Sequence, residues 1–220
     1  MTAVKICGIK TLDDALAAAE AGAGYLGFNF YPRSVRCIDP AACARITAVL
    51  RAEYPKVRLV GIFVNVPAAE IRSVLGSCGL DLAQLHGDEG PEVVAQLAPL
   101  AFKAYRGGFD PARAGLRAEP PACLLDAAVQ GAFGGTGATA DWNAAAGLAR
   151  QVPLFLAGGL NPGNVAEAVR QVRPWGVDTA SGVESSPGVK DAGKIRAFIA
   201  AVRAEDGAIR GSSREELEKQ

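Results

Sequence analysis

The sequence predicts an α/β fold, a compact (β/α)8 TIM barrel in a single domain over residues 1–205, followed by a polar tail over 206–220. Eight short apolar runs alternate strictly with eight helical stretches, which is typical of parallel strands covered by helices. The length of 220 residues suits one domain. Polar residues and glycines follow each apolar run, where the mouth of a barrel lies. The main alternative is an open, doubly wound sheet.

The apolar runs are expected to be strands because they are short, nearly continuous and bounded by glycine or polar residues. They cover 3–7, 25–30, 58–64, 81–85, 101–105, 122–126, 153–157 and 175–179.

The stretches between these runs are rich in Ala, Leu and Arg and predict helices. They cover about 12–21, 40–53, 67–77, 91–98, 111–117, 141–149, 162–172 and 191–204. Thr11 is a candidate cap of the first helix, and Asp191 of the last. Three helices are expected to begin at a proline, in the pairs Asp39-Pro40, Gly90-Pro91 and Asn161-Pro162. The segment after Glu205 is polar and reads as a frayed tail or a short exposed helix outside the core.

Charge and cysteine usage exclude several classes of protein. Lys plus Arg and Asp plus Glu number 23 each, so we expect no nucleic-acid partner. No apolar run approaches the ~18 residues of a membrane helix, and no signal peptide is visible. The cysteines are odd in number and lack metal-ligand spacing, which argues against disulfides or structural zinc and favours a reducing cytoplasm. They lie at positions 7, 37, 43, 78 and 123.

Cys7 is the candidate centre of the chemistry. It ends the first apolar run and precedes Gly8, so its thiol is expected to face the mouth of the barrel. The alternative is a small buried hydrophobic residue, which cysteine often is. The other four cysteines lack this placement and are interpreted as structural.

Two carboxylates end other strands. Asp126 closes an apolar run, where an ionisable group is costly unless it is paired or functional. Asp178 has the same position on the last strand, and either contacts substrate hydroxyls or braces its loop.

The last two strands are followed by loops suited to binding a phosphate. Gly158 and Gly159 allow close approach of the backbone to an anion, and Ser181 and Gly182 offer N–H groups and a hydroxyl. Two ordinary tight turns are the alternative. The glycine run at 134–137 also follows a strand.

Arg36 and Arg33 lie in the longest polar loop, and either can clamp a carboxylate with a two-pronged hydrogen bond. A solvated surface arginine is the alternative. His86 is the sole histidine, so a multi-histidine metal site is excluded. It either lines the pocket or is an ordinary hydrogen-bonded histidine.

Seven of these strand-end segments resemble those of the phosphoribosylanthranilate isomerases of tryptophan biosynthesis, and the likeness runs from about residue 4 to 202. The segments are Val4–Gly8, Gly27–Arg36, Val60–Asn65, Gln84–Gly87, Leu124–Asp126, Leu156–Pro162 and Asp178–Glu184.

The resemblance implies a (β/α)8 barrel that performs an Amadori rearrangement of a phosphosugar, without metal or organic cofactor. It implies that Cys7 is the general base, Asp126 the general acid and Arg36 the holder of the anthranilate carboxylate. The glycines at 158–159 and the loop at 181–182 match the family's phosphate site. The sequence leaves open whether the protein is a monomer or a homodimer.

The chain departs from the family in two places. Relatives often carry a lysine after the glycine run, where this chain has Ala138, and the form Val-Ser-Ser in place of Thr179-Ala180-Ser181. Two alternatives remain. A histidine-pathway sugar isomerase would want an aspartate at position 7 and a second phosphate cup. A non-catalytic barrel that binds a phosphate ligand would show binding without turnover.

Overall fold

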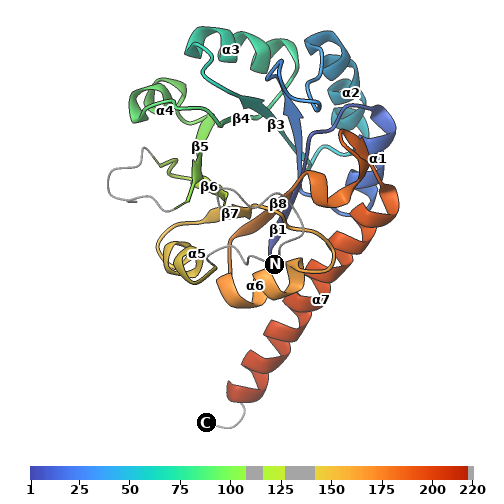
Figure 1. The fold of residues 1–220 in the computed structure, drawn as a ribbon, viewed down its shortest axis with the longest axis vertical. Coiled ribbons are helices and arrows are strands. Elements are labelled where there is room, and N and C mark those ends of the chain that lie inside the picture. Colours follow the sequence, from blue (N-terminus) through green and yellow to red (C-terminus); the bar gives the residue numbers. More distant parts are fainter. Residues whose placement is uncertain (108–115, 127–141, 218–220) are drawn as a thin grey trace.

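In the computed structural model, the chain forms a closed ring of eight parallel strands with helices packed around it (Figure 1). The structure describes residues 1–107, 116–126 and 142–217, with side chains as far as residue 211. The first strand pairs with both the second and the eighth, which closes the ring. The predicted barrel is therefore confirmed, and the open sheet is wrong.

Every predicted strand is present, and each strand end lies within one residue of its expected position. The strands are β1 (Ala3–Cys7), β2 (Tyr25–Asn29), β3 (Arg58–Phe63), β4 (Leu82–Leu85), β5 (Ala101–Arg106), β6 (Cys123–Asp126), β7 (Leu154–Ala157) and β8 (Gly176–Thr179).

Seven helices lie within the described ranges. They are α1 (Leu12–Glu20), α2 (Pro40–Glu53), α3 (Ala68–Ser77), α4 (Pro91–Leu97), α5 (Trp142–Ala149), α6 (Val165–Val172) and α7 (Ala192–Leu217). The helix expected over 111–117 falls mostly outside the described residues, and Leu116 and Arg117 are not helical. No helix in the described part of the chain has the length and apolarity needed to cross a bilayer.

The two expected caps form, at Thr11 and Asp191, and Asp39 caps a third helix. Thr11 accepts a hydrogen bond from the Asp14 amide at 3.2 Å, Asp39 caps α2, and Asp191 accepts from the Lys194 amide at 2.9 Å. These bonds satisfy N–H groups that the first turn of a helix leaves without partners.

The expected start of α6 at Pro162 is wrong. The side chain of Asn161 accepts from the Gly163 amide at 2.8 Å, and that of Asn164 accepts from the Asn161 amide at 2.8 Å. These local bonds hold a turn over 161–164, and the helix begins only at Val165.

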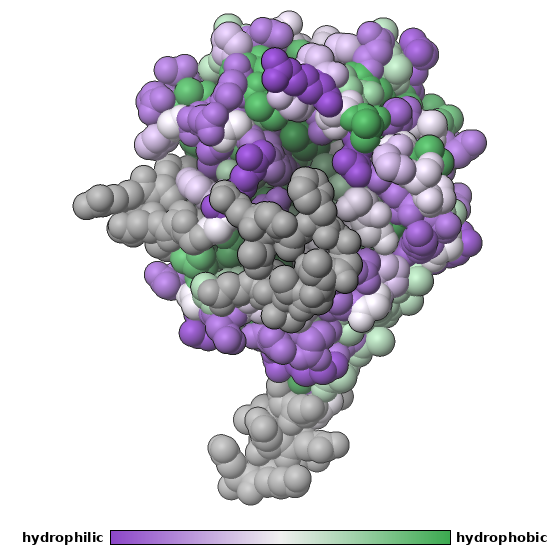
Figure 2. Space-filling view, viewed as in Figure 1, coloured by the Kyte–Doolittle hydropathy of each residue, from purple (hydrophilic) through white to green (hydrophobic). Residues whose placement is uncertain are grey.

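Apolar side chains fill the lower part of the barrel interior. They form a cluster whose buried members are Val60, Leu82, Phe102, Ala104, Leu124, Phe155 and Ala157. Three partly buried residues near the beginnings of strands pack against this cluster: Ala3, Tyr25 and Trp175. Phe155 and Trp175 meet edge to face with ring centroids 5.0 Å apart. A larger cluster fills the space between strands and helices. The surface seen in Figure 2 is mostly hydrophilic outside the grey atoms. Side chains therefore fill the barrel near the amino ends of its strands, and the space for a site lies at the carboxyl ends.

The last helix is longer than the sequence predicts, because α7 continues to Leu217. Its expected apolar stripe is buried and consists of Ile195, Phe198, Ile199 and Val202. Beyond the stripe, Glu205 pairs with Arg170 of α6 at 2.9 Å, and Asp206 accepts from the Thr2 amide at 2.9 Å. Both acidic side chains are buried. Partners distant in sequence therefore extend this helix past the point where its apolar pattern ends.

A short element between β8 and α7 escaped the sequence analysis. It consists of a 3-10 turn, η1 (Ser181–Val183), and a small hairpin of β9 (Glu184–Ser186) and β10 (Val189–Lys190). The hairpin is too short to show the alternation that identifies a strand.

Candidate active site

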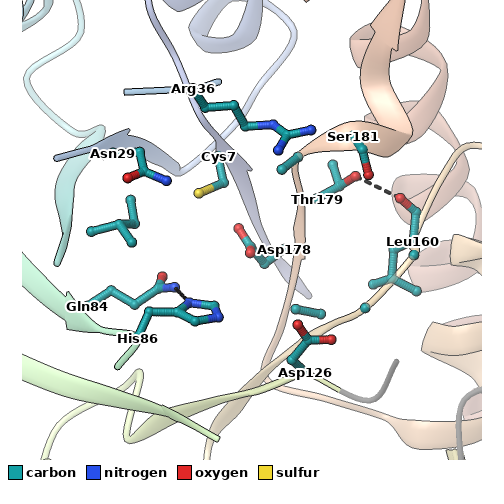
Figure 3. A pocket seen from close by; sticks show the side chains of 15 residues that line it. Cys7, Asn29, Arg36, Gln84, His86, Asp126, Leu160, Asp178, Thr179 and Ser181 are labelled. Carbon is teal, nitrogen blue, oxygen red and sulfur yellow. Dashed lines mark hydrogen bonds between the residues drawn. The ribbon is translucent and has the colours of Figure 1, made fainter. Parts of the chain in front are cut away.

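A cavity of about 270 Å³ opens at the carboxyl ends of the barrel strands (Figure 3). Eight of the nine predicted site residues line it, namely Cys7, Arg36, His86, Asp126, Gly158, Gly159, Asp178 and Ser181. The ninth, Gly182, lies behind the wall, where a side chain would overlap the carbonyl oxygen of Leu160. Gly182 therefore allows η1 to pack against the loop after β7.

The even-numbered strands each contribute one polar side chain to this cavity: Asn29, Gln84, Asp126 and Asp178. Alternate strands of such a barrel supply the members of one layer, so these four form a polar layer above the apolar core. The sequence analysis did not select Asn29 or Gln84 as site residues. The available signal was a polar residue at an inward position of an apolar strand.

The thiol of Cys7 projects into the cavity from the end of β1. A side chain at Gly27, on β2, would place its Cβ 2.9 Å from the Cys7 Sγ, so a glycine there makes room for the sulfur. Lys5 precedes Cys7 by two residues and shares its inward face. The Lys5 Nζ lies 2.8 Å from Oδ1 of Asp178, and the Lys5 side chain is wholly buried.

Opposing effects act on these ionisable groups. Burial raises the pKa of the Cys7 thiol, the positive charge of Lys5 lowers it, Asp178 raises it and Lys190 lowers it, with a net increase. Burial alone would lower the pKa of Lys5, but the negative charges of Asp178 and Cys7 outweigh burial and raise it. A buried cation therefore lies close to the thiol on which the proposed chemistry depends.

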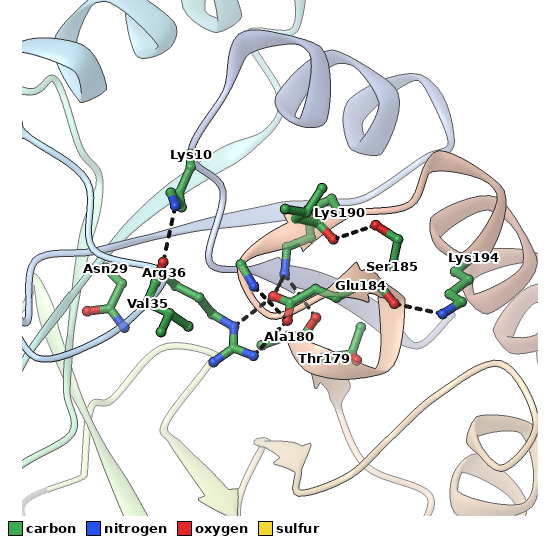
Figure 4. Close-up of polar contacts among 12 residues, drawn as sticks. Lys10, Asn29, Val35, Arg36, Thr179, Ala180, Glu184, Ser185, Lys190 and Lys194 are labelled. Carbon is green, nitrogen blue, oxygen red and sulfur yellow. Dashed lines mark hydrogen bonds and ion pairs between the residues drawn. The ribbon is translucent and has the colours of Figure 1, made fainter.

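The guanidinium of Arg36 is held over the cavity by a paired carboxylate (Figure 4). Its Nε and Nη2 donate to the two carboxylate oxygens of Glu184, each at 2.7 Å, and Nη1 lies on the side away from Glu184. Lys190 also donates to Glu184 at 2.8 Å. Burial opposes ionisation of Glu184, but the bonds from Arg36 and Lys190 hold its pKa at about 2. The Glu184 bond likewise raises the pKa of Arg36.

Gly8 explains the turn after Cys7. Its φ of +79° lies in the left-handed region, and a Cβ there would meet the Cδ of Arg36 at 2.6 Å. The glycine thus serves both the turn and the close approach of the arginine.

His86 lines the cavity beside Gln84. The Gln84 Nε2 and the His86 Nδ1 are 2.9 Å apart. Burial lowers the pKa of His86, the charge of Asp126 raises it and that of Arg106 lowers it, with a net decrease. The imidazole is therefore neutral at neutral pH.

Two loops form the wall near β7 and β8. Gly158 and Gly159 have φ values of 102° and 68°, which only glycine adopts easily. The hydroxyl of Thr179 donates to the Leu160 carbonyl at 2.7 Å and ties the loops together (Figure 3). The glycine run at 134–137 lies outside the described residues. Within the described ranges, no group of His, Cys, Asp and Glu side chains is arranged to hold a metal ion.

A closed barrel with this polar mouth places the protein in the class of (β/α)8-barrel enzymes. The family model for N-(5'-phosphoribosyl)anthranilate (PRA) isomerase matches residues 4–201. The chain belongs to the N-(5'-phosphoribosyl)anthranilate isomerase family.

Curated relatives with the same family name match this chain over nearly their whole length. An N-(5'-phosphoribosyl)anthranilate isomerase of Roseiflexus sp. (strain RS-1) is 50% identical over 212 residues, which cover 93% of this chain and 99% of the relative. The enzyme of the same name from Myxococcus xanthus (strain DK1622) is 47% identical over 206 residues, covering 91% of this chain and 95% of the relative.

Solved structures of this family also superpose on the chain over nearly its whole length. Phosphoribosyl anthranilate isomerase from Thermotoga maritima superposes with a TM-score of 0.81 at 37% identity, covering 93% of this chain and 100% of the other. A phosphoribosyl anthranilate isomerase in complex with reduced 1-(o-carboxyphenylamino)-1-deoxyribulose 5-phosphate has a TM-score of 0.75 at 36% identity, with coverage of 93% and 100%.

Proposed function

We propose that this protein converts N-(5-phosphoribosyl)anthranilate into 1-(2-carboxyphenylamino)-1-deoxyribulose 5-phosphate, the Amadori rearrangement of tryptophan biosynthesis. The observation that carries the proposal is that Cys7 and Asp126 line one cavity, with Arg36 above it and the glycine loops at its wall. The solved relative with the reduced deoxyribulose phosphate compound supports the substrate class. The substrate is a small phosphosugar.

The reaction needs an acid first. Asp126 donates a proton to the ring oxygen of the sugar while the bond from that oxygen to C1 breaks. The lone pair of the anthranilate nitrogen forms a double bond to C1, which gives an open-chain iminium ion. Its positive charge acidifies the hydrogen on C2.

A base is needed next. The Cys7 thiolate removes the C2 proton, and the released electron pair forms the C1–C2 double bond and restores the nitrogen lone pair. The resulting enolamine becomes the ketone by losing its C2 hydroxyl proton and gaining one at C1. Because burial raises the pKa of the thiol, the Lys5 ammonium is the charge that makes the thiolate attainable.

Binding is assigned to the two ends of the cavity. Nη1 of Arg36 is directed away from Glu184 and donates to the anthranilate carboxylate. Backbone N–H groups at Gly158, Gly159 and the 181–182 loop receive the phosphate. Asp178 and His86 contact the sugar from the cavity wall.

The cellular setting follows as an expectation. All five cysteines are free thiols, which supports a cytoplasmic protein. We expect no nucleic-acid partner, and a monomer or a homodimer in solution. Sedimentation would distinguish the two assemblies.

Fluorescence of freshly made phosphoribosylanthranilate tests the function. We expect it to decay faster in the presence of this protein, and faster decay to require both Cys7 and Asp126. Binding of the reduced deoxyribulose phosphate compound without turnover would favour a non-catalytic barrel. Turnover of the histidine-pathway substrate alone would favour the related sugar isomerase.

A further inference from the structure

Gln84 is a buried amide in the wall of the active-site cavity whose two ends differ in their hydrogen bonding. Its side chain comes from β4, and the residue is only 1% exposed. Nε2 contacts Nδ1 of His86 at 2.9 Å. Oε1 is buried and has no hydrogen-bond partner among the described residues. Buried carbonyl oxygens nearly always have a partner, so this acceptor indicates a ligand that brings a donor.

The contact with His86 fixes where the imidazole proton lies. An amide nitrogen can only donate, so Nδ1 of a neutral His86 must accept, and the ring proton must be on Nε2. The opposite orientation of the amide would pair Oε1 with an Nδ1–H and leave two amide N–H donors buried without partners. The observed orientation uses one amide N–H for His86 and leaves the second N–H and the Oε1 acceptor, and an acceptor suits a sugar hydroxyl.

The tautomer matters because His86 and Asp126 line the same cavity (Figure 3). An imidazole with a free Nε2 lone pair would compete with the substrate as acceptor of a proton from Asp126. An imidazole that already carries hydrogen on Nε2 cannot, and it offers a donor instead. Charged groups on four strands act on the ring, namely Asp126, Arg106, Asp178 and Lys5.

We propose that Gln84 is a positioning residue for the isomerisation: its amide N–H holds His86 as the neutral Nε2–H tautomer, and its Oε1 receives a hydroxyl of the open-chain pentose. The tautomer keeps the proton of Asp126 available for the substrate. This inference rests on the proposed function, since it assigns Asp126 as the acid.

The sole histidine makes a direct test possible. In protein labelled with ¹⁵N, one pair of imidazole nitrogens gives signals, and we expect a protonated Nε2 and an unprotonated Nδ1 at neutral pH. An Nδ1–H tautomer in the wild-type protein would overturn the proposal without any variant.

Gln84→Glu and Gln84→Met extend the test. A carboxylate at position 84 accepts from Nδ1, so Gln84→Glu should move the proton there, whereas Gln84→Met should give a mixture of tautomers. Both should lower kcat/KM about tenfold or more, in line with the loss of a hydrogen bond or two. Gln96→Glu, on the exposed face of α4, is the matched control and should change neither the tautomer nor kcat/KM.

The hydroxyl contact has its own readout. Reduced 1-(o-carboxyphenylamino)-1-deoxyribulose 5-phosphate should bind Gln84→Met more weakly than wild type by a similar factor, with thermal unfolding showing that the variant is folded. Equal affinity would overturn that contact. If the wild-type protein lacks isomerase activity, the proposed function fails, while the NMR and binding measurements still decide the role of Gln84.

Discussion

Nζ of Lys5 lies 2.8 Å from Oδ1 of Asp178, and the pair lies within the barrel on the inward face that also carries Cys7. Removing two charges from water costs about as much free energy as their attraction returns, so such a pair is a weak source of stability. The position of this ion pair next to Cys7, the proposed base, explains its presence by chemistry and not by stability. Lys5 supplies positive charge to the thiolate, and Asp178 keeps that charge compensated when the thiol is protonated.

Replacing Lys5 by Met should raise the pKa of the Cys7 thiol further, because the main opposing charge is removed. At a given pH the rate of Cys7 alkylation by iodoacetamide, followed by mass spectrometry of its peptide, should fall. The variant should lose about 3–5 kcal/mol of unfolding free energy, because Asp178 is left buried without a counter-ion. The double variant Lys5→Met, Asp178→Leu should recover stability but not alkylation. Unchanged alkylation in Lys5→Met would contradict the assigned role.

Asp126→Asn removes the proposed proton donor with almost no change in shape. We expect kcat to fall about 10²–10⁴-fold, the usual contribution of general acid catalysis. In Cys7→Ser, kcat should fall at least as far, because a hydroxyl is a much weaker acid than a thiol and forms the anionic base less readily. Both variants should unfold at temperatures near that of the wild type. Wild-type turnover in either would defeat the assignment.

Glu184→Gln should loosen Arg36 and raise KM more than it lowers kcat. The folded-state pKa of Glu184 is about 2, below its ordinary value of 4.5. The stability that its carboxylate contributes is therefore present above about pH 4.5 and is lost as the pH falls towards 2. The melting-temperature difference between variant and wild type should shrink over that interval. If the melting-temperature difference stayed constant from pH 7 to pH 2, the ion pair between Glu184 and Arg36 would not be the source of that stability.

Gly27→Ala places a methyl group 2.9 Å from the Cys7 sulfur and should displace the thiol. Overpacking of this kind costs about 1–3 kcal/mol of stability. Activity should fall by about tenfold or more, because even small misplacement of a reacting group slows catalysis. Gly24→Ala is the matched control, since its nearest neighbour is the Val4 carbonyl oxygen at 4.0 Å. Equal activity in the two variants would show that the thiol tolerates the methyl group.

The sequence was most informative where local rules decide the structure. Short apolar runs predicted all eight strands of the barrel, and the position of Cys7 and Asp126 at strand ends predicted that they share a cavity. Parallel strands in a closed ring leave little freedom in where such residues lie.

It was least informative where the decisive partner is distant. In the sequence, Lys5 is a single polar residue within an apolar run. Its role becomes visible only in the fold, where Asp178 lies beside it on the neighbouring strand. Gln84 is hidden in the same way. The length of α7 depends on Thr2 and Arg170, which cannot be inferred from the pattern of α7 itself.

The pairing of β1 with β8 also bears on how the protein is made. Lys5 leaves the ribosome 173 residues before Asp178. Pairings so remote in sequence form late and slowly. A nascent chain therefore carries Lys5 without its counter-ion until β8 has been made, and the buried pair forms only when the ring closes.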